Sequence, residues 1–173
     1  MSFASSEQAA YDELCGYTLA HGDPSFIHQH VVDAFAVQQA DENTKPIKIT
    51  FGLVGLYLRV EKQWSGRRVQ QAHMALARQK HAWPTFVLPR DRGAVTPQTV
   101  LAAPAGPERD AAIDAWCASV WNAFAMVSDG CQMGVRHPSD THLTPRMNRE
   151  KIVDLLVEHA IIDRRVVPGS RNR

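Results

Sequence analysis

The stretch IKITFGLVGLYLRVEKQW, residues 47–64, decides the fold class of this chain. It follows Lys45-Pro46, and proline suits the first turn of a helix because no backbone N–H is needed there for the helical hydrogen bonds. Apolar residues cover nearly its whole circumference, which is typical of a helix at the centre of a bundle. Gly52 and Gly55 cost helix stability relative to alanine, so we expect a neighbouring helix to pack closely against them.

Start signals predict further helices before and after this one. Asp23-Pro24 fits an N-cap followed by the first helical residue, because the carboxylate accepts an N–H that the helix leaves unpaired. The predicted helices run from Ser5 or Ser6 to about Gly22, from Pro24 to about Ala40, from Ile47 to Trp64, onward from Ser65, onward from Gly106-Pro107, and onward from Thr144-Pro145 or Asn148.

Two segments interrupt the helical periodicity. Between Trp83 and Gly106 the prolines forbid a continuous helix, and Thr96-Pro97 can open only a short one. We expect this segment to be an ordered, proline-rich loop that lies over the bundle. Residues 126–147 are rich in Gly, Ser, Asp, His and Pro, and predict an irregular loop or insertion.

The composition fits one globular domain. The 173 residues are 45% hydrophobic and 21% charged with a formal net charge of +1, which argues against disorder and makes nucleic acid an unlikely partner. The longest apolar run, residues 49–58, is about ten residues long, and a membrane span needs about twenty. Cysteines without a C-x-x-C pair and the lack of a signal peptide predict a cytoplasmic location. The fold prediction is all-α: a compact bundle of five to six helices in one domain over residues 1–163, with a basic flexible tail at 164–173.

Charge is unevenly distributed along the chain. Residues 1–58 carry seven acids and two lysines, whereas residues 59–92 carry eight bases and two acids. One interpretation is two helical pairs with solvated faces of opposite sign, and the other is a surface that binds an acidic or anionic partner.

Asp33 is the first candidate for a functional residue. It stands in the middle of a predicted helix, in the string Val31-Val32-Asp33, where aspartate is a poor helix former and an unpaired buried carboxylate is costly. It is either exposed to solvent, or accepts hydrogen bonds that fix the packing of helices, or serves as a general base or metal ligand.

Two histidines complete the candidate site. His73 shares a helix face with Val69 and Leu76, so it points inward either as a core residue or as a partner of Asp33 in an acid–base pair. His28 and His30 are two residues apart and cannot share one ion on a helix, and His28 is the better candidate ligand. Weaker metal candidates lie in the predicted loop at Cys131, His137 and His142.

An ordered series of short strings resembles a widespread bacterial domain family of unknown function. The strings are His28-x4-Asp33-Ala34-Phe35-Ala36, Gly55-Leu56-Tyr57-Leu58 with Glu61, Gln70-x2-His73-Met74, Gly93-x2-Thr96, Pro104-x-Gly106-Pro107 and Trp116-x-x-Ser119-Val120-Trp121. The resemblance covers about residues 11–125 and implies a helical domain, but it implies no activity. Members of that family often carry Tyr in place of Phe35 and His in place of Gln39, so a site built on those groups is incomplete here.

The functional prediction is a helical protein with one polar pocket that binds a small molecule. Its catalytic residues would be Asp33 and His73, and a divalent transition metal would be held by His28, Asp33 and His73. The alternative is a non-catalytic interaction protein that binds an acidic partner or self-associates as a homodimer. The sequence does not decide whether the chain is an enzyme.

Overall fold

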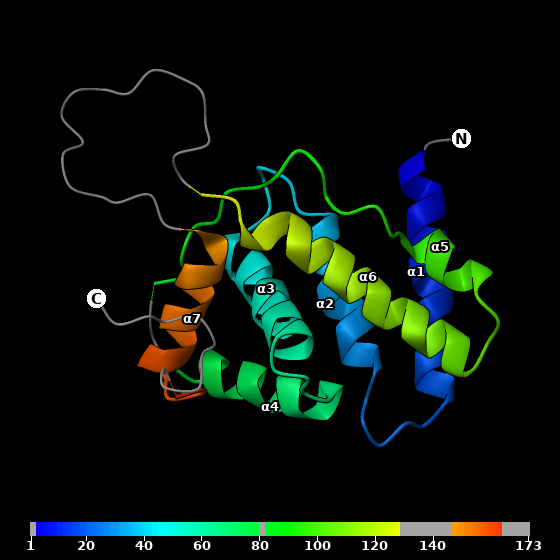
Figure 1. Cartoon of the computed structure of the whole chain (residues 1–173), viewed down its shortest axis with the longest axis horizontal. Coiled ribbons are helices and arrows are strands. Elements are labelled where there is room, and N and C mark those ends of the chain that lie inside the picture. Colours follow the sequence, from blue (N-terminus) through cyan, green and yellow to red (C-terminus); the bar gives the residue numbers. More distant parts are fainter. Residues whose placement is uncertain (1–2, 80–81, 129–146, 164–173) are drawn as a thin grey trace.

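The computed structural model describes residues 3–79, 82–128 and 147–163. Within these residues the chain is all-α, as predicted, with seven helices in place of five or six. Helices α2, α3 and α6 pack together at the centre, with α1 and α5 on one side and α4 and α7 on the other (Figure 1). The helices are α1 (Phe3–Ala20), α2 (His28–Gln38), α3 (Pro46–Val60), α4 (Gly66–Ala77), α5 (Pro97–Ala102), α6 (Pro107–Ala125) and α7 (Asn148–Glu158).

Helix α3 is the central helix that its apolar sequence predicts. The side chains of Leu53, Leu56 and Leu58 are fully buried. Its two glycines meet α2 so closely that a Cβ atom at Gly52 would lie 2.4 Å from Val37 Cγ2. The prediction of close helix packing at these glycines is therefore confirmed.

The predicted start of α2 is wrong by about one turn. The Asp23 carboxylate accepts the backbone N–H groups of Ser25 (2.8 Å) and Ile27 (3.2 Å), so it caps a turn that precedes the helix. Phe26 has a φ of 59°, and a helix cannot continue through that conformation. The helix therefore begins at His28 and not at Pro24.

Other helix boundaries agree better with the sequence. Ser65 and Thr96 accept backbone N–H groups as N-caps of α4 and α5, and Pro107 opens α6. Helix α3 ends at Val60, before the predicted Trp64. Asn148 is the first helical residue of α7 and not its cap.

Some predictions concern residues outside the described part of the chain. These are most of the predicted loop at 126–147, with Cys131, His137 and His142, and the whole basic tail at 164–173. The division into domains stays a prediction. Among the described residues, no helix is long and apolar enough to cross a membrane.

Candidate functional site

Asp33 lies in the tightest contact between α2 and α3. Its side chain is 3% exposed, and its Oδ1 atom accepts a hydrogen bond from Gln29 Nε2 at 3.0 Å. Oδ2 has no hydrogen-bond partner, and a Cβ atom built on Gly55 would lie 1.9 Å from it. Burial raises the pKa of the Asp33 carboxyl well above its usual range, although the Gln29 hydrogen bond acts in the opposite direction. The geometry therefore favours a neutral carboxylic acid enclosed between two helices.

His73 packs against the same helix, one turn from Gly55. Its ring meets Phe51 edge-on with centroids 5.0 Å apart, and its Nε2 atom is buried without a partner. Burial lowers the pKa of His73 to about 4, so the ring is neutral at pH 7. No hydrogen bond or ion pair connects His73 with Asp33 in the described chain. The acid–base pair that the sequence suggests is therefore not assembled in this structure.

The two neighbouring histidines of α2 differ in environment. His28 is half-buried, and its Nδ1 lies 2.9 Å from Thr18 Oγ1, which itself donates to the Leu14 carbonyl. His28 Nδ1 is consequently the donor to Thr18, and Nε2 carries the lone pair. His30 is 2% exposed, its Nδ1 has no partner, and burial lowers its pKa to about 4. Sequence periodicity alone did not identify His30 as the inward ring.

A metal site at these residues has no geometric support. Within the described residues, no group of three or more His, Cys, Asp or Glu side chains is arranged to bind a metal ion. The metal set of His28, Asp33 and His73 stays a prediction, and none of these three residues lines the cavities described below.

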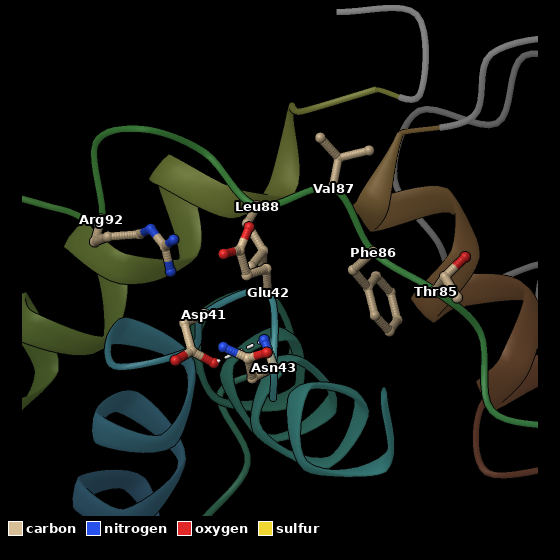
Figure 2. Close-up of a pocket in the computed structure, with 8 residues that line it drawn as sticks. All are labelled: Asp41, Glu42, Asn43, Thr85, Phe86, Val87, Leu88 and Arg92. Atoms are coloured by element: carbon tan, nitrogen blue, oxygen red, sulfur yellow. Dashed lines mark hydrogen bonds between the residues drawn. The ribbon is translucent and has the colours of Figure 1, made fainter. Parts of the chain in front are cut away.

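The largest described cavity is a surface groove on another part of the molecule. It has a volume of about 730 Å³ and lies between the α2–α3 turn, residues 41–43, and the extended segment after α4, residues 85–88, with Arg92 at one end (Figure 2). A smaller cavity of about 170 Å³ adjoins it and shares much of the same lining. We call the larger cavity the groove and the smaller one the recess.

One side of the extended segment is fixed by Asn148. Val87 donates its N–H to Asn148 Oδ1 (3.1 Å), and Asn148 Nδ2 donates to the Val87 carbonyl (2.8 Å) and to the Phe124 carbonyl (2.9 Å). Asn148 is fully buried, so a side chain of α7 pairs with Val87 as a neighbouring β-strand would.

The other side of the extended segment is unpaired. Phe86 and Leu88, which flank Val87, make no backbone hydrogen bond in the described chain, and both line the groove. Successive residues of an extended chain direct their N–H and C=O groups to opposite sides, so pairing of Val87 with α7 turns those of Phe86 and Leu88 away from α7. The segment therefore resembles the exposed edge of a sheet.

Polar side chains of the helices fix the rest of this segment. Gln38 Nε2 donates to the Val95 carbonyl at 2.8 Å, and Gln38 Oε1 accepts from Trp116 Nε1 at 2.8 Å. Ser119 Oγ accepts the Val95 N–H at 3.2 Å. Trp116 and Ser119 of the family-like strings thus have structural roles. Glu61 of those strings also has one, because it accepts hydrogen bonds from Trp121 and Arg149.

Sequence reasoning missed the groove residues. Pro84 and Pro89 flank a short apolar run and favour an extended backbone, so they could have indicated the extended segment. Nothing in the local sequence indicates that Asn148, some 60 residues further on, pairs with Val87.

Comparisons with known proteins give a family but no activity. A family model described as "Family of unknown function (DUF5946)" matches residues 6–125, from within α1 to the end of α6. The match includes both walls of the groove and ends before α7. No curated protein and no solved structure matches the chain.

Proposed function

Because the chain belongs to the family of unknown function DUF5946, whose description carries no activity, we propose a function from the geometry of this chain itself. The protein is a non-catalytic binding protein that takes up an extended peptide segment in the groove between residues 41–43 and 85–88. The bound segment adds to the free edge of residues 85–88 as a strand adds to a sheet.

One observation supports this proposal above the others: the backbone polar groups of Phe86 and Leu88 have no partner among the described residues, and both residues line a groove of about 730 Å³. Main-chain hydrogen bonds to such an edge give affinity, and the neighbouring recess can accept an alternate side chain of the peptide. The groove also falls within the roughly 300–1,000 Å³ that is usual for ligand sites.

Catalysis at Asp33 and His73 has less support. Both side chains are buried and line neither the groove nor the recess, and Oδ2 of Asp33 lies against Gly55. A catalytic group must reach its substrate within hydrogen-bond distance, which a closed helix contact prevents.

The acidic-partner alternative has one observation in its favour. Helix α4 contains no acidic residue and exposes Arg67, Arg68 and Met74, which is 48% exposed, and the exposed Arg78 follows the helix directly. Two of these arginines already contact the chain itself, since Arg67 donates to the Pro24 carbonyl and Arg68 lies 3.7 Å from the Trp64 ring centroid. We therefore rank this surface second, and homodimer formation stays a prediction.

The peptide proposal can be tested by NMR on the isotope-labelled full chain. The probe is the blocked hexapeptide Thr-Val-Gln-Val-Thr-Val, and we expect it to shift the amide signals of Phe86 and Leu88 and of the turn at 41–43. Two further probes carry N-methyl groups on alternate residues. Because only alternate amides of a bound strand face the protein, one methylated probe should lose binding and the other should keep it.

These probes leave the protein unchanged, so misfolding of a variant cannot produce the result. Equal loss of binding with both methylated probes would contradict strand addition. No shift at residues 85–88 with the unmodified probe would contradict the proposed function altogether.

A further inference from the structure

The recess next to the groove indicates which peptides bind. We infer that the site selects segments with a Lys or Arg side chain at the position that enters the recess between the acidic turn and Phe86. This inference rests on the proposed function and specifies the class of peptide that the groove binds.

The lining of the recess combines apolar and acidic residues. Ile49, Phe86 and Leu88 supply apolar side chains, and Asp41 and Glu42 supply carboxylates. Long basic side chains bury their aliphatic stems on such surfaces and keep the charged head at a polar rim. A neutral apolar side chain would contact the apolar residues but would leave the charge of both carboxylates uncompensated.

Both carboxylates are available to a ligand. Asp41 Oδ1 accepts the backbone N–H of Asn43 (3.0 Å, Figure 2) and the hydroxyl of Thr44 (2.7 Å), which fixes the turn, and no other side chain of the described residues donates to this carboxylate. The Thr44 hydroxyl lowers the pKa of the Asp41 carboxyl, which keeps it ionised at pH 7. Glu42 is exposed, and its side chain forms no hydrogen bond or ion pair in the described chain.

Two cations near the groove, Arg92 and Lys151, contact other parts of the chain. The Arg92 guanidinium donates to the Ala40 carbonyl and lies 5.6 Å from the Phe124 ring centroid. Arg92 lines the groove but not the recess. Lys151 donates to the Thr85 carbonyl from α7 and does not line the recess either. Among the described residues, the lining of the recess therefore contains two acids and no base, which complements a basic side chain.

The test uses the hexapeptide probe and two relatives that differ only at the central Gln, which becomes Lys or Glu. We expect the Lys peptide to bind roughly fivefold more tightly than the Gln peptide, and the Glu peptide to bind more weakly than both, as for a partly exposed ion pair. Added salt should reduce the difference between the Lys and Glu peptides.

Protein variants then locate the preference. In Asp41→Asn combined with Glu42→Gln, the Lys preference should vanish while affinity for the Gln peptide stays the same. Asn at position 41 retains an oxygen that can accept both hydrogen bonds of the turn. Glu108→Gln is the matched control, because this exposed acid opens α6 at the end opposite Phe124.

The outcomes separate the two proposals. If the three peptides bind with equal affinity and shift residues 85–88, the ligand class is wrong and the proposed function stands. If none of them binds, the proposed function fails. If the amide signals of 85–88 change with protein concentration alone, a second copy of the chain occupies the groove and the inference is overturned.

Discussion

Two regions of this protein contain unpaired polar groups, and they differ in access. In the closed region, on α2 and α4 of the buried core, Asp33 Oδ2, His30 Nδ1 and His73 Nε2 are buried without partners among the described residues. In the open region, the backbone groups of Phe86 and Leu88 border a groove. An unpaired group that a ligand cannot reach only costs stability and defines packing, whereas one beside a cavity can bind a ligand.

The largest expected effect concerns the histidines of the closed region. Burial lowers the pKa of His30 and of His73 to about 4, whereas an unfolded imidazole titrates near 6.5. Between these values the unfolded chain binds protons that the folded chain does not. Each imidazole thus contributes stability that is present above about pH 6.5 and is lost as the pH falls towards about 4, by about 3 kcal/mol.

Urea denaturation at a series of pH values measures this loss. Between about pH 6.5 and pH 4, the free energy of unfolding should fall less in His73→Gln than in the natural chain. The difference should be about the contribution of one imidazole. The exposed His21→Gln substitution is the matched control. An unchanged acid sensitivity in His73→Gln would show that the ring is accessible to protons, and the contrast between the two regions would disappear.

The next effect concerns the open region and its support by α7. Asn148→Ala removes the hydrogen bonds to Val87 and Phe124 and leaves the partly buried N–H and C=O groups of Val87 unpaired, while the Phe124 carbonyl still accepts the Val127 N–H. Each such group costs about 1–3 kcal/mol, so we expect the free energy of unfolding to fall by about 3 kcal/mol.

Peptide binding should also weaken in Asn148→Ala, because residues 85–88 lose the contact that fixes their edge. Asn43→Ala is a suitable control for stability, since Asn43 is exposed and donates only its backbone N–H to Asp41. If Asn148→Ala loses stability but binds the peptide as tightly as the natural chain, peptide binding does not depend on the contact between residues 85–88 and α7.

The sequence predicted those parts of the fold that depend on local chemistry. The apolar circumference of α3, its paired glycines, and the caps at Ser65 and Thr96 all follow from residues within one or two turns of each other. The start of α2 was predicted wrongly, because Asp23-Pro24 is equally compatible with the isolated turn that it caps.

The candidate sites depend on distant residues, and sequence patterns did not reach them. Helical spacing placed Asp33 and His73 inward, and both are buried. Spacing could not show that they pack against different turns of α3 with no hydrogen bond between them. The groove was missed because its walls are about 40 residues apart in sequence and its edge is fixed by a side chain of α7.

The smallest effect, and the sharpest test of the closed region, is expected for Asp33→Asn. A neutral carboxylic acid and an amide have nearly the same shape, and the amide oxygen can still accept the Gln29 hydrogen bond, so stability at pH 4, where the carboxyl is largely protonated, should change by about 1 kcal/mol or less. The pKa of the folded Asp33 is raised, so the natural chain loses stability as the pH rises from about 4 towards that pKa, and the variant does not. Denaturation at pH 4 and pH 7 should therefore show a larger gain of stability with rising pH in Asp33→Asn. A loss of several kcal/mol at pH 7 would instead mean that Asp33 is ionised and paired with a cation, and the predicted metal site would again be the better interpretation of this region.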